Sequence, residues 1–227
     1  GTVNNTVVDD TDATTVTLTA NAANVTEGGS IVYTATVGSP VTGSPLVITL
    51  TGGTTITIPV GASSANSAPV AVRADDAYTQ GSEVVTRGIT GTSGGNYEAL
   101  TTSSTVSVNV TDDADATTVT LSSATNGNAI TEGGSIVYTA TVGAPVAGSP
   151  LVVTLSNGAT ITIPVGASSA NSAPVAVRAD DVYVQGTQTL ATVSISSTSG
   201  GNFEALTTSG TVNNTVVDDT DATTVTL

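Results

Sequence analysis

The sequence predicts an all-β protein made of two tandem β-sandwiches, and three observations support this prediction. Thr makes up about a fifth of the 227 residues, whereas aromatic residues contribute only 3%. Such β-branched side chains fit a pleated sheet better than a helix. Short apolar and polar alternations are separated by Gly, Pro, Ser and Asn, and long stretches recur along the chain.

The repeats define the expected domain organisation. Residues 26–38 recur unchanged at 131–143, and residues 55–76 recur at 160–181, so both offsets are 105. The first 18 residues reappear as the last 18, which we interpret as an excerpt from a longer tandem array. We expect the end of a preceding repeat and its linker at 1–12, domains at 13–111 and 116–217, an acidic linker at 112–115, and a linker with the start of the next repeat at 218–227.

Each repeat is predicted to contain seven short strands. In the first repeat we expect them at Ala13–Thr19, Ser30–Val37, Leu46–Leu50, Thr55–Val60, Ala68–Arg73, Val84–Thr90 and Thr102–Val110. Period-two alternation is clearest in the second to fourth of these strands, which indicates one buried face. The TGGT segment at 51–54 is typical of a hairpin turn. Seven strands in about 100 residues favour an immunoglobulin-like sandwich.

The sixth predicted strand of the first repeat can be aligned with the second repeat in two ways, which differ in where they place Arg87. Counted back from the shared TSGGN segment, Arg87 takes the place of Val193 and would point into the core. Counted forward from the shared QG segment, Arg87 matches Thr192 and is exposed. We prefer the second alignment, with an irregularity near Gly88, because an unpaired buried charge costs more than a bulge. The length differences between the repeats are expected in turns or loops.

The charge balance excludes several classes of function. Eighteen acidic residues face three Arg and no Lys, which gives a net charge of −15. Nucleic acids and anionic membranes are therefore not expected as partners. Without Cys or His, the chain has neither thiolate metal ligands nor the commonest general base. The missing nucleophile and general base lead us to expect no enzyme. No apolar run reaches the length of a membrane span, so we expect no membrane insertion.

Seventeen of the 18 acidic residues fall into recurring clusters, which are the candidate metal ligands. They are Asp9, Asp10, Asp12, Glu27, Asp75, Asp76, Glu98, Asp112, Asp113, Asp115, Glu132, Asp180, Asp181, Glu204, Asp218, Asp219 and Asp221. An odd number of antiparallel strands places the clusters at Glu27, Asp75 and Asp112 at the C-terminal end of the first domain. We expect them to meet Glu204 of the next domain.

Carboxylates that converge without a cation repel one another, by about 1 kcal/mol per pair at roughly 4 Å even in water. Ca²⁺ relieves this because it accepts six to eight oxygen ligands in flexible geometry, whereas Mg²⁺ demands an octahedron. The alternative is that the Asp residues serve only as turn formers, because Asp bonds its own backbone. Neither an EF-hand loop nor a GGxGxD nonapeptide is present.

The chain resembles the immunoglobulin-like extender repeats of the large RTX and biofilm adhesins of Gram-negative bacteria, of the large adhesion protein type. The resemblance spans essentially the whole chain and rests on ITEGGSIVYTATV, APVAVRADDVYVQG, SGGNFEAL and VDDTDATTVTL. The EGGS, DD and DDxD pattern is also similar to Calx-β domains. The resemblance implies type I secretion, calcium uptake outside the cell and rigid chaining of domains, with calcium ligands at the acidic positions given above.

We therefore expect a stalk segment of a secreted surface adhesin that supports attachment or biofilm formation, stiffened by Ca²⁺ at its junctions. Its expected partners are neighbouring repeats of the same chain; we expect a monomer with no specific ligand. The first alternative is a calcium-dependent carbohydrate-binding module, which would need an exposed calcium site and sugar-reading groups. The second is a glycosidase with two carboxylates, which the adjacent Asp75 and Asp76 do not favour because neighbouring side chains on a strand point in opposite directions.

Overall fold

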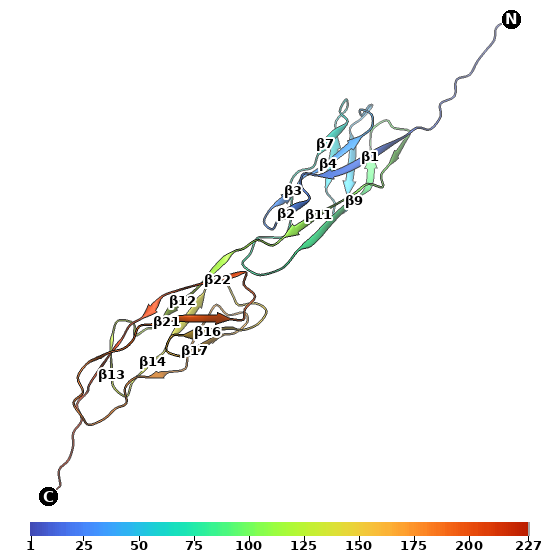
Figure 1. Cartoon of the computed structure of the whole chain (residues 1–227). Helices are drawn as coiled ribbons and strands as arrows, with labels where there is room; N and C mark the ends of the chain where they lie inside the picture. The colour runs from blue at the N-terminus through green and yellow to red at the C-terminus, as the bar shows by residue number, and fades with distance from the viewer. Residues whose placement is uncertain (227) are drawn as a thin grey trace. The chain divides into compact units, whose positions relative to one another are not determined.

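The computed structural model describes residues 1–226, and within them it contains strands and no helix. The chain divides into two compact units (Figure 1). Residues 1–75 and 80–113 form the first unit, and residues 76–79 together with those from 114 onward form the second. Each unit encloses its own hydrophobic core. The predicted all-β class with two tandem domains is thus confirmed.

The strands of the first unit form two main sheets and one small pair. They are β1 (Ala13–Ala20), β2 (Asn24–Thr26), β3 (Ser30–Ile31), β4 (Tyr33–Val37), β5 (Leu46–Leu50), β6 (Thr55–Ile58), β7 (Ser64–Asn66), β8 (Val70–Ala71), β9 (Glu83–Ser93), β10 (Ala99–Thr101) and β11 (Thr105–Thr111). One sheet has the order β10-β1-β4-β7 and the other β2-β11-β9-β5-β6, while β3 pairs with β8.

The core lies where the alternating apolar residues of these strands face inward. Alternate residues of β4 and β5 are buried, namely Tyr33, Ala35 and Val37, and Leu46, Ile48 and Leu50. In the β5–β6 hairpin, Leu46 stands opposite Ile58 and Ile48 opposite Ile56, so both strands bury the same face. The predicted turn at 51–54 joins them, with Gly52 and Gly53 at positive φ.

Two expected strands are interrupted. The segment predicted at Ser30–Val37 breaks at Val32, whose N–H donates to the Asn21 side chain at 2.9 Å and whose carbonyl accepts from the Asn21 N–H at 3.0 Å. As a result β3 pairs with β8, while β4 pairs with β1. The segment predicted at Ala68–Arg73 contains only β8, because Pro69 has no N–H for a ladder.

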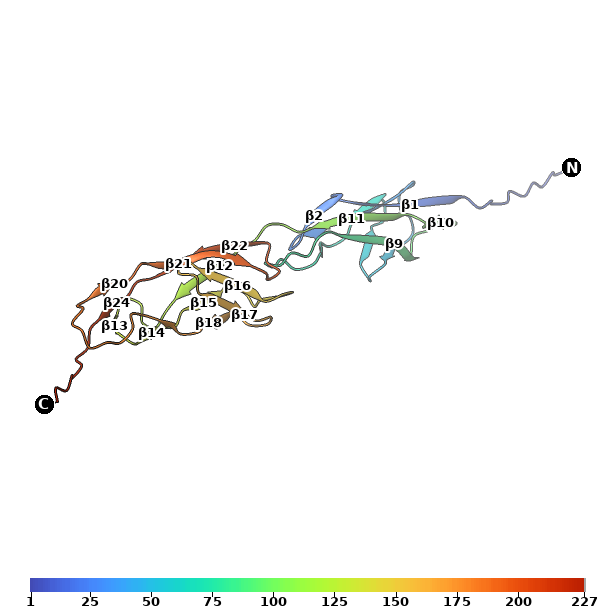
Figure 2. The same cartoon turned by 60° about the horizontal axis from the view of Figure 1, so that its bottom comes forward.

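The second unit repeats this architecture with a divided second sheet. Its strands are β12 (Ala116–Ser122), β13 (Ala129–Thr131), β14 (Ser135–Ile136), β15 (Thr139–Val142), β16 (Leu151–Leu155), β17 (Thr160–Ile163), β18 (Ser169–Asn171), β19 (Val175–Ala176), β20 (Gln188–Thr189), β21 (Val193–Ser199), β22 (Ala205–Ser209), β23 (Thr211–Val212) and β24 (Thr215–Val217). The sheets are β18-β15-β12-β22, β17-β16-β21-β23 and β13-β24-β20, with a β14-β19 pair. Figure 2 shows β13, β20 and β24 together at the end of the unit that leads to the C-terminus.

The expectation that Arg87 aligns with Thr192 is wrong. Arg87 stands opposite Val106 in β11, as Val193 stands opposite Val212 in β23, so Arg87 occupies the place of Val193. The Arg87 side chain is half-buried: its Nη1 donates to the Thr86 carbonyl at 3.3 Å, whereas its Nε is buried and has no hydrogen-bond partner among the described residues.

The expected irregularity near Gly88 exists as a register shift at Thr49 and Leu50, and the second unit has the same shift at Thr154 and Leu155. It is therefore a shared bulge, not a consequence of Arg87. The second repeat is longer than the first at two places. The residues added after Leu121 lie in the turn between β12 and β13, as expected, whereas the residue added after Gln185 lies between β20 and β21, where it interrupts the strand pairing.

Candidate metal centre

Glu27 and Asp113 are brought together by a parallel pair of strands. Glu27 directly follows β2 and Asp113 comes two residues after β11, and these strands run parallel with Thr26 beside Thr111. The Glu27 N–H extends the pairing by donating to the Thr111 carbonyl at 3.0 Å. Parallel neighbours end at the same edge of a sheet, so both carboxylates lie at that edge.

Asp75 reaches the same edge through the turn that follows Glu27. Gly28 has φ of +70°, and its N–H donates to the Arg73 carbonyl at 2.9 Å. A Cβ added at Gly28 would lie 2.9 Å from the Asp75 Cβ, closer than real side chains approach. Glycine is therefore required here for the turn to pack against Asp75.

Glu27, Asp75 and Asp113 form the acidic cluster of the first unit. Each offers a carboxylate oxygen within 4.8 Å of the others. The Glu27 side chain has no solvent-exposed surface. Its Oε2 accepts a hydrogen bond from Arg73 Nε at 2.6 Å, whereas its Oε1 is buried and has no hydrogen-bond partner among the described residues. A buried, unpartnered carboxylate oxygen is costly unless a cation or donor approaches it.

Two cations, Arg73 and Arg178, belong to these centres although the acidic pattern of the sequence did not predict them. Arg73 Nη2 pairs with Asp112 Oδ1 at 2.7 Å, and Arg178 pairs with Glu132 at 2.8 Å and with Asp218 at 3.1 Å. The available signal was the RADD segment, which places Arg two residues before Asp75 and Asp180 in both repeats. Each centre therefore contains one positive charge that partly offsets the carboxylates.

Asp112 is held beside this Arg by backbone groups. Its Oδ2 accepts from the Gln80 N–H at 2.9 Å and from the Gly81 N–H at 3.4 Å. The hydrogen bond from Gln80 is the main cause of a lowered Asp112 pKa, with contributions from Gly81 and Arg73. Hydrogen bonds to the ionised form favour it, so Asp112 acts as a structural anion that positions Arg73.

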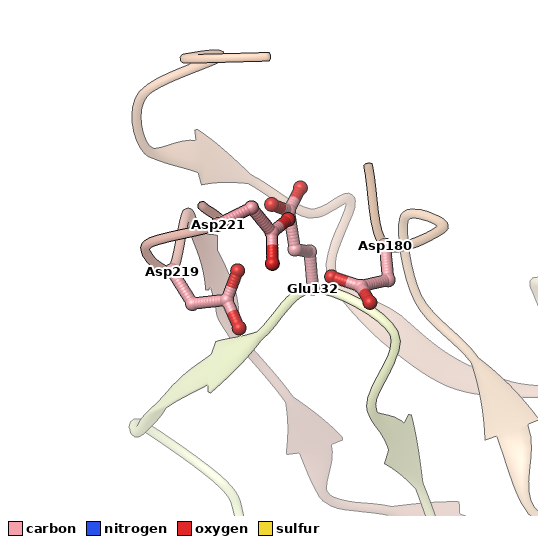
Figure 3. Close-up of side chains that lie close together, drawn as sticks. All are labelled: Glu132, Asp180, Asp219 and Asp221. Atoms are coloured by element: carbon pink, nitrogen blue, oxygen red, sulfur yellow. The ribbon is translucent and has the colours of Figure 1, made fainter. Parts of the chain in front are cut away.

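The second unit carries the matching cluster, with four carboxylates. Glu132, Asp180, Asp219 and Asp221 each offer an oxygen within 4.8 Å of the others, and Figure 3 shows the four carboxyl groups turned toward a common space. Glu132 follows β13, while Asp219 and Asp221 follow β24, its parallel neighbour. The local construction is thus the same as around Glu27.

The crowding of negative charge is visible in the pKa values of this cluster. Burial raises the pKa of Glu132, although Arg178 opposes the rise. Burial also raises the pKa of Asp221, and the neighbouring carboxylates of Asp219, Asp180 and Asp181 raise it further. Both shifts mean that the ionised cluster is less favourable than separate carboxylates in water.

The remaining candidate residues take part in local hydrogen bonds. Asp76 Oδ1 accepts from the Tyr78 N–H and Asp181 Oδ1 from the Tyr183 N–H, both at 2.8 Å, which is turn chemistry of the kind weighed as the alternative. Glu98 accepts from the Asp12 N–H, and Glu204 accepts from the Asp115 N–H.

Asp9 and Asp10 are exposed, and Asp218 binds Arg178 as Asp112 binds Arg73. The convergence of Glu204 on the acidic residues of the first repeat stays a prediction. No helix among the described residues has the length and apolar character needed to cross a membrane.

Comparison with known proteins places this repeated architecture in a family. A family model described as the LapA domain matches residues 12–113 and again residues 115–220. The chain therefore belongs to the LapA domain family and contains two copies of the domain. No curated protein sequence matches the chain.

Among solved structures, the chain is similar to one described as the crystal structure of a tetra-tandem repeat in the extending region of a large adhesion protein. The identity is 20% and the TM-score 0.35, and the match covers 91% of this chain. The chain spans about half of that structure, 49% of its length.

Proposed function

We propose that the chain is a calcium-stiffened extender segment of a bacterial surface adhesin. Membership of the LapA domain family and the tandem organisation support the extender role. The observation that carries the calcium proposal is that a carboxylate cluster of the same construction occurs in both units, and that in the first a buried oxygen of Glu27 has no hydrogen-bond partner among the described residues.

The chemistry of the donor set fits Ca²⁺. All candidate ligands are carboxylates, which are hard oxygen donors, and the chain has no His or Cys to favour zinc. Glu27, Asp75 and Asp113 would hold the ion in the first unit, and Glu132, Asp180, Asp219 and Asp221 would hold it in the second. Burial and, after it, neighbouring carboxylates raise the pKa values of Glu132 and Asp221, and a divalent cation would favour the ionised forms of both groups.

Calcium bound in this way would restrict the linker between the repeats. Asp113 lies in the acidic segment that joins them, and an ion held jointly by Asp113 and the buried Glu27 would tie that segment to the sandwich. Metal bridging would also remove charge repulsion that otherwise favours many linker conformations. In calcium each linker would then be stiff, and without calcium it would be flexible.

The setting follows from this role. We place the segment outside the cell, where millimolar calcium is available to sites with dissociation constants on the order of 10⁻⁴ to 10⁻³ M. Its partners would be neighbouring repeats of its own chain, and its contribution to attachment or biofilm formation would be length and stiffness. Catalysis and a specific macromolecular ligand are not expected.

Small-angle scattering in calcium and in chelator tests the proposal. The wild-type chain should show a longer and narrower distance distribution in calcium. A double variant, Glu27→Gln with Glu132→Gln, should give the chelator profile under both conditions. The control is Glu83→Gln, which removes an exposed carboxylate outside both clusters. A wild-type profile that does not respond to calcium would overturn the stiffening role.

A further inference from the structure

The second unit contains a cavity that the proposed function does not use. Its volume is about 390 Å³, within the range of roughly 300 to 1,000 Å³ that small-molecule sites occupy. Its walls are mainly apolar, and they include Ile136, Tyr138, Val177, Leu190, Val193 and Val212.

The cavity lies where the second repeat has its extra residue. In the first unit β9 pairs with β11 without interruption from Glu83 to Gly88. In the second unit the equivalent pairing stops at Thr189, at the end of β20, and resumes at Val193, at the start of β21. Between them the Leu190 N–H still donates to the Asn214 carbonyl at 3.0 Å, but no regular strand pairing forms, and Leu190 and Ala191 line the cavity.

Asn214 belongs to the cavity lining, and one of its side-chain atoms lacks a partner among the described residues. The residue is 5% exposed, and its Nδ2 donates to the carbonyls of Thr125 and Asn128. These two bonds fix the orientation of the amide, because a flipped amide would place oxygen against oxygen. Its Oδ1 is buried and accepts no hydrogen bond within the described chain. Nearby, the Tyr138 hydroxyl accepts from Asn157 Nδ2 at 3.3 Å, which leaves its own O–H to donate.

The matching position in the first unit is built differently. Asn157 and Asn214 are replaced there by Gly52 and Val108, and Val193 is replaced by Arg87. The Arg87 guanidinium lies over Gly52, where an added Cβ would be 3.5 Å from Arg87 Cζ. Burial raises the pKa of Tyr33, the counterpart of Tyr138, and the charge of Arg87 opposes that rise. The side chain of Arg87 therefore occupies the region that is open in the second unit.

We propose that this cavity binds a small neutral molecule with an apolar body and a hydroxyl group, that is, an aliphatic or aromatic alcohol. The apolar walls would cover the body of the molecule, and its hydroxyl would donate to Asn214 Oδ1 and accept from Tyr138. An anionic ligand fits less well, because Arg178 at the wall is already paired with Glu132 and Asp218 and the chain carries a net charge of −15. The proposal does not depend on the calcium sites.

Titration of the whole chain with 1-hexanol, followed by ¹⁵N–¹H NMR in calcium, tests the proposal. We expect saturable shifts at the amides of Leu190, Ala191, Val193 and Asn214, with a dissociation constant on the order of 1 mM. The methyl ether of 1-hexanol has no donor for the Asn214 oxygen, so we expect it to bind about tenfold more weakly. Equal binding of the two compounds would remove Asn214 as the recognition group.

Two variants localise the site. Val193→Arg introduces the residue that fills the corresponding space in the first unit, so it should abolish the hexanol shifts. Asn214→Val introduces the residue type that the first unit has at the equivalent position, Val108. Because it removes the accepting oxygen, hexanol and its methyl ether should then bind equally weakly. The same spectra report whether each variant is folded, and one folded variant is enough for the test. Absence of saturable shifts in the wild type, or unchanged shifts in a folded Val193→Arg chain, would overturn the proposal.

Discussion

Glu27 is the residue at which the burial of a charge and the proposed metal binding would meet. Its buried carboxylate accepts a hydrogen bond from Arg73 through one oxygen, while the other oxygen has no donor within residues 1–226. The Arg limits the cost of burying the charge in the absence of metal. Under the calcium proposal, the other oxygen would serve as a ligand of the ion.

Substitution of Glu132 by Gln tests this division of roles in the second unit. We expect calcium affinity at the second cluster to fall at least about tenfold, because the substitution removes a charged ligand from a site whose affinity depends on ligand charge. Isothermal titration calorimetry of the variant, beside the Glu83→Gln control, measures the change. An unchanged binding isotherm would exclude Glu132 as a ligand.

The role of Arg178 predicts a calcium-dependent stability effect. In chelator, Arg178→Met should destabilise the second unit by about 3 to 5 kcal/mol, because it leaves the buried Glu132 without a counter-charge. Calcium should restore part of that loss by supplying positive charge to the same carboxylates. Urea denaturation with and without calcium measures both effects. The control is Arg87→Met, which lies outside both clusters and should lose the same amount of stability with and without calcium. If calcium also left the stability loss of Arg178→Met unchanged, calcium and Arg178 would not act on the same carboxylates.

At the scale of elements, the sharp turn after β13 positions the cluster as much as the strands do. A Cβ added at Gly133 would lie 2.9 Å from the Asp180 Cβ, and Gly133 has φ of +73°. The turn and the Asp180 segment therefore pack at a distance that only glycine permits. The same relation holds between Gly28 and Asp75 in the first unit.

Gly133→Ala should accordingly weaken calcium binding several-fold by displacing Asp180, and it should also destabilise the second unit. The matched control is Gly158→Ala: Gly158 has φ of +86°, but a Cβ there meets no atom within 4 Å. This control should cost about 1 to 2 kcal/mol of stability from backbone strain and leave calcium affinity unchanged. If calorimetry gave both variants the same affinity, the close packing at Gly133 would not be what positions the ligand.

At the scale of the whole molecule, near-identical repeats suit a function that depends on length. The 11 residues of β9 alone extend about 36 Å at the rise of a β-strand, so each added repeat would lengthen a stalk by several nanometres. Residues 55–76 and 160–181 are identical. Surfaces specialised for different macromolecular ligands would have less reason to share them.

In-frame deletion of repeats from the parent adhesin tests this interpretation. Attachment of cells should decrease with the number of repeats removed, whichever repeat is deleted, because each contributes the same length. The measurement is adhesion to a surface under flow across a deletion series. A loss tied to one particular repeat, or saturable glycan binding by the isolated chain, would instead favour a carbohydrate-binding module.

The amino-acid sequence by itself determined the all-β class, the two tandem domains and most of the strands, because alternation and exact repetition are local patterns. It also identified the acidic residues that gather at one edge of each unit. Only the tertiary structure showed that Arg73 and Arg178 enter these clusters, since ion pairs between residues 46 positions apart depend on how separate turns pack. Strand pairing likewise decided which residue Arg87 aligns with and where the cavity beside Leu190 lies. One inserted residue can lie in a loop or can interrupt a sheet. Which of the two occurs depends on the balance between core packing and hydrogen bonding, and the local sequence does not show that balance.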